Sequence, residues 1–440
     1  MRHGLIWVGL AGFVMAAIAS WPLVRAWGAA PEPAQVDAGE LLREKRYLEI
    51  EALLSSGAGL DPLDSAFVQG VMANRTNRVA DSIRLLEPLV SVLSVAHKRW
   101  AVIALSTLAD DYEKSFRYGD AADTYAALTN RFGNEMSAAA RERARVEAER
   151  WNLLRRAPPQ RAVVDAPFTL QGVRDALGLL EVQVRMGNHN QWMLLDTGAN
   201  ISAISRSTAQ QLGLRLSSTT ATSTGVSGKP MLVHTAVVPK LQLGRATFRH
   251  VAVMVVDDDD MRIPQRNYRI RGSIGFPVLS ALRKITFLPD GQVRIAVPES
   301  AARPVQQNLF LEKLTPVVAV TVDNTQRLFT IDTGSTGSFL SVAFYREHRG
   351  EFDSQAMSTL ELVGVGGSSS IPTYQASNVS LVVGGCSIVL EHILVLTASP
   401  NRSDDKFFGI LGQSVLKRLR SYTFDFTNMA FVAESASEDF

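Results

Sequence analysis

The first third of the chain has the pattern of amphipathic helices. From about residue 36 to residue 156 the sequence reads as helical, with stretches rich in Ala, Leu, Glu and Arg and no strand pattern between them. Segments 45–54, 77–90 and 117–129 each consist of a short polar turn followed by an amphipathic helix. Because their spacing is roughly that of helix-pair repeats, the sequence predicts an α-helical repeat domain over residues 36–156.

A change of pattern follows this domain. The stretch 156–160 contains Pro158 and Pro159, which remove backbone donors and cannot continue a helix. Beyond it, short runs rich in Val, Ile, Leu and Thr are broken by Gly and Asn, as is typical of an antiparallel β domain. A second proline-bearing junction, 297–304, divides this region in two. The sequence therefore predicts two β-rich lobes, over residues 165–297 and 305–440.

The two pieces of the β region repeat each other. Leu195-Asp196-Thr197-Gly198 recurs 136 residues later, from Asp196 to Asp332, as Ile331-Asp332-Thr333-Gly334. Three more motif pairs recur in the same order at nearly the same spacing: 225–228 with 364–367, 272–275 with 409–412, and Thr286-Phe287 with Thr423-Phe424. Four motifs in one order at one spacing indicate a duplicated fold.

Each Asp-Thr-Gly turn has a chemical logic. An apolar strand anchors the aspartate, and the glycine permits a tight turn with close backbone approach. If the lobes pack about a pseudo-two-fold axis, Asp196 and Asp332 meet at the axis within reach of one water. Two carboxyls so close share one proton, because both cannot ionise readily. One can then take a proton from water while the other protonates an amide carbonyl, which is peptide hydrolysis without a covalent intermediate.

Residues 165–440 resemble the retropepsin and pepsin class of aspartic peptidases, and within it bacterial proteins with two catalytic lobes in one chain. The resemblance rests on the two Asp-Thr-Gly loops, the Gly-rich segments at Gly225 and Gly364, and the apolar-apolar-Gly turns at Gly275 and Gly412. It implies a mainly-β bilobal acid-protease fold with pseudo-two-fold symmetry. The implied activity is that of an aspartic endopeptidase with a polypeptide substrate, catalytic residues Asp196 and Asp332, and no cofactor.

The same resemblance implies roles for the residues around the dyad. Thr197 and Thr333 would hydrogen-bond across the lobe interface and hold both loops rigid, and the support of the site would be completed by Gly198, Gly334 and Ser335. The substrate-binding flaps would be Gly225, Val226, Ser227 and Gly228 in the first lobe and Gly364, Val365, Gly366 and Gly367 in the second. A plain hairpin tip is the alternative interpretation of each. Neither flap has the tyrosine expected in pepsins, which leaves the shape of the subsites open.

One difference between the two loops suggests a difference in charge. Ala199 follows the first glycine and has no side-chain donor, whereas its counterpart Ser335 has a hydroxyl that could donate to Asp332. A hydrogen bond to the charged form favours ionisation. The hypothesis is that Asp332 ionises more readily and Asp196 holds the shared proton.

The helical domain has two interpretations. Its segment 118–128 resembles a tetratricopeptide-type helix with small contact residues. That resemblance implies a surface on which substrates or a protein partner dock. A spacer that only packs against the catalytic region fits the sequence as well.

The N-terminus predicts export. Leu5 to Val24 form an uncharged run long enough to cross a bilayer as one helix, and 26–30 could supply a cleavage site. Residues 1–30 are therefore a signal peptide or a membrane anchor, and Trp21 and Trp27 at its end favour the anchor. The family resemblance and the single cysteine, Cys386, favour a bacterial periplasmic location, anchored to the inner membrane or soluble after cleavage.

Composition excludes several other functions. Lys and Arg number 45 against 43 Asp and Glu, a net charge of +2 with no basic face for nucleic acid. The run Asp257 to Asp260 lacks the pattern of a calcium loop and is expected to be a solvated loop, so no metal is assigned. Zinc and serine hydrolase motifs are missing. The remaining alternative to an enzyme is a non-catalytic envelope scaffold that uses the helical repeats and the peptidase-like cleft to hold partners.

Overall fold

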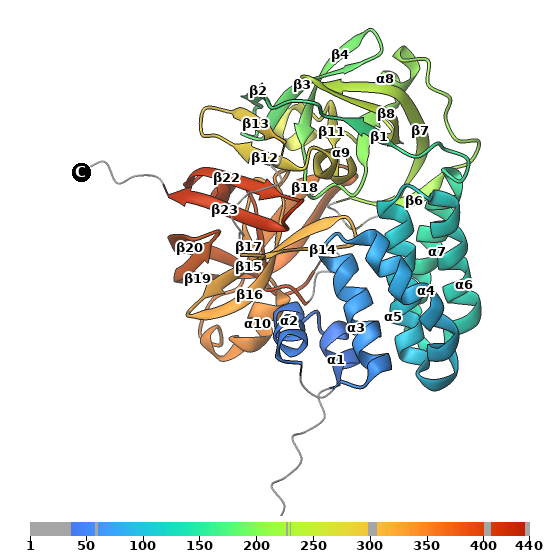
Figure 1. Cartoon of the computed structure of the whole chain (residues 1–440). Coiled ribbons are helices and arrows are strands. Elements are labelled where there is room, and N and C mark those ends of the chain that lie inside the picture. Colours follow the sequence, from blue (N-terminus) through green and yellow to red (C-terminus); the bar gives the residue numbers. More distant parts are fainter. Residues whose placement is uncertain are drawn as a thin grey trace, which may run out of the picture. The chain divides into compact units, whose positions relative to one another are not determined.

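Helices fill the described chain up to residue 153. The computed structural model describes residues 37–57, 60–225, 228, 230–297, 306–399 and 406–435. The N-terminal helices are α1 (Ala38–Arg43), α2 (Tyr47–Ser56), α3 (Pro62–Arg75), α4 (Val79–Ala96), α5 (Lys98–Lys114), α6 (Tyr118–Phe132) and α7 (Ala138–Leu153), with a 3₁₀ turn at Gly133–Glu135 (Figure 1). Local sequence fixes their starts. Asp61 caps α3 by accepting from the backbone N–H groups of Leu63 and Asp64 at 2.8 and 2.9 Å, and Pro62 occupies the first helical position.

The same tight turn joins three pairs of these helices. Between α1 and α2, α3 and α4, and α5 and α6, one residue takes a left-handed conformation: Lys45 (φ 55°), Asn77 (φ 58°) and Phe116 (φ 60°). In each case an arginine follows and its N–H reaches back five residues, for example from Arg78 to the Ala73 carbonyl at 2.8 Å. The turns fall at the starts of the three segments that the sequence singled out as related.

The first lobe is built on one long sheet. Its strands are β1 (Arg161–Val163), β2 (Phe168–Arg174), β3 (Leu180–Met186), β4 (His189–Leu195), β5 (Ser202–Ser205), β6 (Ala221–Thr224), β7 (Pro230–Leu243), β8 (Ala246–Val256), β11 (Gly272–Ile274), β12 (Lys284–Phe287) and β13 (Gln292–Ala296). A small separate pair is formed by β9 (Arg262–Ile263) and β10 (Tyr268–Arg269). Short helices are α8 (Arg206–Gln211), α9 (Phe276–Ala281) and the 3₁₀ turn Pro264–Arg266. Most neighbouring strands are antiparallel, but β11 lies parallel to β4.

The second lobe repeats this order of elements. Its strands are β14 (Leu309–Glu312), β15 (Thr315–Val322), β16 (Thr325–Ile331), β17 (Phe339–Leu340), β18 (Ser358–Gly364), β19 (Gly367–Val383), β20 (Cys386–Leu396), β21 (Gly409–Leu411), β22 (Leu419–Asp425) and β23 (Ala430–Ser435). Its short helices are α10 (Val342–Glu347), α11 (Gln413–Leu416) and the 3₁₀ turn Arg349–Glu351. Here β21 lies parallel to β16, as β11 does to β4 in the first lobe.

A shared ladder joins the two lobes. β12 of the first lobe pairs antiparallel with β22 of the second, so that Thr286 lies opposite Thr423 and their hydroxyls are 2.8 Å apart. These are the residues that the duplication made equivalent, and they face each other directly. Four phenylalanines are buried around this ladder: Phe276, Phe287, Phe424 and Phe426. The ring of Phe424 contacts the rings of Phe287 and Phe426. The lobes therefore share one core at their junction.

Two sequence predictions fall outside the described residues. They are the signal peptide or anchor at residues 1–30 and most of the second proline-bearing junction, residues 298–304. Within the part of the chain that the structure describes, no helix combines the length and apolar character needed to cross a membrane.

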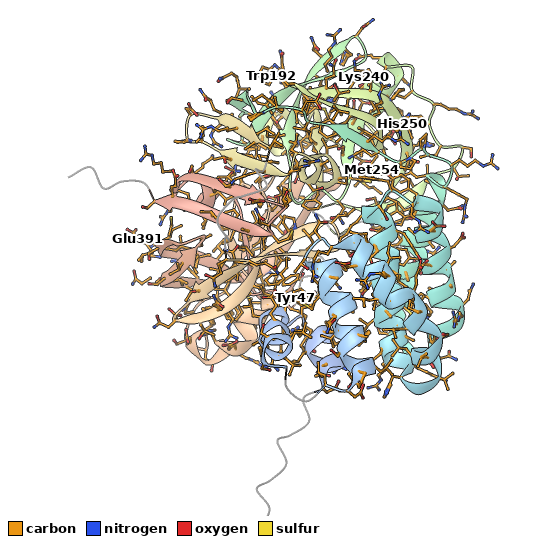
Figure 2. All side chains as sticks on the ribbon, in the orientation of Figure 1. Tyr47, Trp192, Lys240, His250, Met254 and Glu391 are labelled. Atoms are coloured by element: carbon orange, nitrogen blue, oxygen red, sulfur yellow. The ribbon has the colours of Figure 1, made fainter. Side chains whose placement is uncertain are left out.

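The helices are tied to the second lobe through the turn between β14 and β15. Glu312 at this turn accepts a hydrogen bond from the hydroxyl of Tyr47, which Figure 2 labels at the start of α2. The same carboxylate lies 3.2 Å from Lys45 Nζ and 3.5 Å from Arg75 Nε. These cations hold the pKa of Glu312 well below its usual range, although burial acts the other way. The contact is a charged network with little solvent access.

Loss of one cation from this network should destabilise the protein. Arg75→Met leaves Glu312 and Asp110 short of a partner in a site where the arginine side chain is only 12% exposed. We expect a loss of about 3 kcal/mol in the free energy of unfolding, because a buried charge is left incompletely paired. The measurement is denaturant unfolding at pH 7. Arg145→Met, which breaks exposed ion pairs of α7, is the matched control and should leave stability nearly unchanged. Equal effects of the two changes would contradict this account of Glu312.

Candidate active site

The two aspartates stand at equivalent places in the two lobes. Asp196 directly follows β4, and Asp332 directly follows β16. The backbone N–H of Asp196 donates to the Ile274 carbonyl at 3.0 Å, and that of Asp332 donates to the Leu411 carbonyl at 2.9 Å. Both acceptors end the short parallel strand beside the aspartate. The backbone of each aspartate is thus hydrogen-bonded to the sheet, and the neighbouring strands fix the position of the aspartate.

Two threonines lock the loops together across the lobe interface. Thr197 and Thr333 are 1% and 2% exposed. The backbone N–H of each donates to the hydroxyl of the other at 3.0 Å. Each hydroxyl in turn donates across the interface, from Thr197 to the Ile331 carbonyl at 2.9 Å and from Thr333 to the Leu195 carbonyl at 2.7 Å. Cross-lobe hydrogen bonds were expected of both threonines, and the structure has four of them.

The two glycines bring each loop against the opposite acid. A Cβ at Gly198 would lie 2.6 Å from both carboxylate oxygens of Asp332, and one at Gly334 would lie 2.6 Å from Asp196 Oδ1. No side chain fits at that distance. The absence of a Cβ is therefore what lets each carboxyl approach the other lobe.

The pair of acids is electrostatically strained. The pKa of Asp196 is raised well above its usual range, first because protein surrounds the carboxyl and next because the charge of Asp332 is close, within hydrogen-bond reach. The N–H groups of Gly198 and Ala199 donate to Asp196 Oδ1 at 3.0 and 3.1 Å and act in the opposite direction. Asp196 thus favours its protonated form. Both acids are still partly exposed, so that a water or substrate can reach them.

The hydrogen bond that the structure gives the Ser335 hydroxyl differs from the expected one to Asp332. Its hydroxyl donates to the Gly337 carbonyl at 2.9 Å, within its own loop, and the single hydroxyl proton is used there. Asp332 Oδ1 accepts a hydrogen bond from the backbone N–H of Gly334 at 2.8 Å. Ser335 shapes the turn, and the tendency of Asp196 to hold a proton has the causes given above.

Two serines that sequence reasoning missed brace the loops. The hydroxyl of Ser202 accepts from the Gly275 N–H at 3.0 Å, and the hydroxyl of Ser338 accepts from the Gly412 N–H at 2.9 Å. Each lies six residues after its aspartate, an offset that the duplication shows on inspection. Gln413 adds a bond from its side-chain amide to the Thr333 carbonyl at 2.9 Å. The apolar-apolar-Gly turns therefore hold the catalytic loops through serine side chains.

The predicted flaps are hairpins that meet at Gly225 and Val365. β6 and β7 form the first, and β18 and β19 form the second, in which Gly364 pairs with Gly367 around Val365 and Gly366. Gly366 has a left-handed φ of 83°. At Gly225 the backbone is so close to the Val365 carbonyl that a Cβ would overlap it. Gly228 is described and exposed, whereas Val226 and Ser227 lie outside the described residues. The flap function of these segments stays a prediction.

The acidic run is more ordered than expected. Asp257 and Asp259 are exposed, as a solvated loop requires, but Asp258 pairs with Arg269 and accepts from the Ser207 hydroxyl at 2.6 Å. The Asp260 carbonyl accepts from the Gly366 N–H at 3.0 Å. The loop thus holds the tip of the second flap on the first lobe.

Among the residues that the structure describes, no group of three or more His, Cys, Asp and Glu side chains could hold a metal ion. The dyad itself has the donor set of an acid pair: two carboxyls, of which one keeps a raised pKa. Such a pair can donate and accept one proton at the same time.

Comparison with known proteins agrees with this geometry. Residues 182–278, which contain Asp196 and the first flap, match the model of a family described as aspartyl protease. No curated protein matches the chain. Among solved structures, a retropepsin-like aspartic protease from Rickettsia conorii is 15% identical, with 31% of this chain and 91% of that chain covered and a TM-score of 0.22. With so low a score, the fold is argued from the chain's own strands. The family match supports an aspartyl protease, a hydrolase, over the first lobe.

The raised pKa of Asp196 predicts a pH-dependent stability. A carboxyl whose pKa rises on folding favours the folded state below its unfolded pKa, and this contribution is lost as the pH rises through the folded value. Asp196→Asn removes the titration but keeps an oxygen that accepts from Gly198 and Ala199. The variant should therefore gain stability relative to the wild type as the pH rises from about 4 to about 8.

Thermal unfolding at several pH values measures this difference. Asp353→Asn, a substitution of an exposed aspartate, is the control for the chemical change itself. A difference between wild type and Asp196→Asn that stays constant with pH would sink the claim of a raised pKa.

Proposed function

We propose that the chain is an aspartic endopeptidase that hydrolyses peptide bonds with a water activated by Asp196 and Asp332. One observation carries the proposal. Each aspartate faces the glycine of the opposite loop, and the pKa of Asp196 is raised in part by the charge of Asp332. Two carboxyls that lie this close together, one protonated and one ionised, can donate and accept a proton at the same time.

The mechanism follows from the unequal acids. Asp196 begins protonated and Asp332 begins ionised. The water oxygen attacks the amide carbon while Asp332 takes a proton from the water. At the same time Asp196 gives its proton to the carbonyl oxygen. As the C–N bond breaks, Asp332 gives its proton to the nitrogen and Asp196 recovers a proton from a hydroxyl of the tetrahedral intermediate, so that the water supplies the hydroxyl of the new acid and the hydrogen of the new amine. The donors Gly198, Ala199 and Gly334 hold the carboxyl oxygens in place throughout.

We infer further that a pseudo-two-fold axis relates the lobes and passes between the aspartates. Three reciprocal contacts support it: Thr197 with Thr333, the two glycines with the opposite acids, and Thr286 with Thr423. Each joins residues that the duplication makes equivalent. One chain then carries a complete active site without dimerising.

We also propose a narrow biological role, the processing of exported or membrane proteins in a bacterial periplasm. The uncharged run from Leu5 to Val24 supports export, with the segment retained as an anchor or removed as a signal peptide. Tethering and a helical repeat domain that binds a protein partner would raise the local concentration of selected substrates. Cell fractionation of the full chain, with mass spectrometry of its N-terminus, tests the location. A cytoplasmic, uncleaved protein would overturn it.

The central experiment compares wild type with Asp196→Asn and Asp332→Asn on a library of unfolded peptides from pH 3 to pH 8. We expect cleavage by the wild type and a loss of at least about 1,000-fold in each variant, because either change removes the shared proton. Circular dichroism checks that both variants fold. Cleavage that survives in either variant contradicts the dyad. No cleavage by a folded wild type at any pH would favour the non-catalytic scaffold.

A second prediction concerns the glycine contacts. Gly198→Ala places a methyl group against the Asp332 carboxyl and must displace it. We expect kcat to fall about 100-fold, since displacement of a catalytic group by about 1 Å has that order of effect. Gly350→Ala is the matched control, because a Cβ there meets open space. Peptidase kinetics of the two variants decide the point. Full activity in Gly198→Ala would mean that the acids need not approach so closely.

A further inference from the structure

We propose that the helical region positions the first catalytic loop, residues 196–202, through the turn between β14 and β15, and that Thr315 is the positioning residue at the point of contact. This inference rests on the proposed peptidase function. It gives the helical region a part in catalysis in addition to any role in docking.

The turn is gripped by helices on one side. Glu312 is bound by Tyr47, Lys45 and Arg75, which come from α2, the turn before α2, and α3. Its neighbour Lys313, held in a left-handed conformation at φ 54°, lies 3.2 Å from Glu147 Oε1 of α7. The turn thus contacts helices from both ends of the helical region.

Lys313 also reaches the ring of Tyr125 in α6, with Nζ 5.4 Å from the ring centroid. The carboxyl of Glu113 in α5 is buried beside it, and burial and the charge of Glu147 raise its pKa to about 8. Five helices, α2, α3, α5, α6 and α7, therefore contribute side chains around Glu312 and Lys313. A turn enclosed in this way cannot move independently of the helices.

The other side of the turn touches the catalytic loop. The hydroxyl of Thr315, the first residue of β15, donates to Asn200 Oδ1 at 3.1 Å. Leu314 is 4% exposed and lines a small cavity with Ile201 and Ser202 of the loop, and the same cavity is lined by Glu113 and Trp151 of the helices. Helices, turn and catalytic loop meet at this point.

A second connection runs through the segment that follows the helices. The side-chain amide of Gln160 donates to the Pro277 carbonyl at 2.9 Å, at the start of α9. The neighbouring N–H of Phe276 donates to the Ala199 carbonyl at 2.8 Å. Gln160 thus contacts α9, and α9 in turn holds the first loop at Ala199.

This support bears directly on the acid. The N–H of Ala199 donates to Asp196 Oδ1 at 3.1 Å and stabilises its ionised form. A loop that loosens at Asn200 weakens that bond, which raises the pKa of Asp196 further. The equivalent turn of the first lobe, between β2 and β3, has a different partner. It is held by Tyr268 of the same lobe, whose hydroxyl donates to Asp175 at 2.6 Å. The helices therefore support the two loops unequally.

The test removes the Thr315 hydroxyl and keeps its shape. Thr315→Val should lower kcat about threefold to tenfold, the size of one lost hydrogen bond, with a smaller change in KM. The alkaline limb of the pH–rate profile should move to higher pH, because Asp196 loses part of the support of its charge. Thr315→Ser keeps the hydroxyl and should restore both. Thr286→Val loses a similar Thr hydroxyl contact away from the loop and is the matched control, with an unchanged pH profile.

Hydrogen exchange gives a readout that needs no substrate. In Thr315→Val, amides of residues 197–202 should exchange faster than in wild type, while those of the second loop, 333–338, should not. Glu312→Gln, which weakens the grip of the helices, should produce the same pattern at a distance. If the first loop exchanges as in wild type in both variants, the inference is overturned, whether or not the protein proves to be a peptidase. A wild type that cleaves nothing overturns the proposed function and leaves the exchange result to decide the support of the loop.

Discussion

The structure depends on two threonine hydroxyls that cross the interface between the lobes. The hydroxyls of Thr197 and Thr333 each donate once and accept once, and all the partners of these hydroxyls belong to the opposite lobe. Because both residues are buried, separation of the lobes without water would break four hydrogen bonds, and each buried polar group left unpaired costs about 1–3 kcal/mol. The loops that carry the aspartates are therefore fixed relative to each other before any substrate arrives. Catalytic carboxyls need this rigidity, since small displacements have large effects on rate.

The remaining features of the site use that fixed geometry. Glycines at 198 and 334 allow approach, and serines at 202 and 338 hold the loops from behind. Burial and the closeness of Asp332 together raise the pKa of Asp196, and in the proposed mechanism the proton that Asp196 holds goes to the carbonyl oxygen. The two hairpins meet where Gly225 lies against the Val365 carbonyl, and the second is held at the Asp260 carbonyl. The helices add support from one side through Glu312 and Thr315.

The sequence predicted those parts of the structure that duplication marks twice. Asp196 and Asp332, their threonines and their glycines could be found because the same three residues, Asp-Thr-Gly, recur after an apolar residue, and the fold class followed from the change of pattern at Pro158. Ser202 and Ser338 carry the same signal but sit in dissimilar sequence, Ile201-Ser202 against Gly337-Ser338, and were missed. The Ser335 hydroxyl donates to the Gly337 carbonyl two residues on and not to Asp332 as expected, and no residue pattern reveals this choice of acceptor. The starts of the three related helical segments were found because polar turns precede them.

Contacts between distant parts of the chain could not be predicted. Tyr47 and Glu312 are 265 residues apart, and neither lies in a motif. The acidic run at 257–260 looked solvated because its partners, Arg206, Arg269 and the Gly366 N–H, come from other elements. Such contacts depend on how the lobes and helices pack, and a single sequence gives only the period and the local turn chemistry of each element.

The measurement that tests the account most directly is a carboxyl titration by ¹³C NMR of aspartate-labelled protein, with the wild type compared with Asp332→Asn. The account predicts that one aspartate signal of the wild type, lost in Asp196→Asn, titrates well above the usual range of aspartate and moves down when Asp332 is replaced, because a like charge has been removed. Two aspartates that titrate independently near pH 4, unaffected by each other's replacement, would contradict a shared-proton dyad.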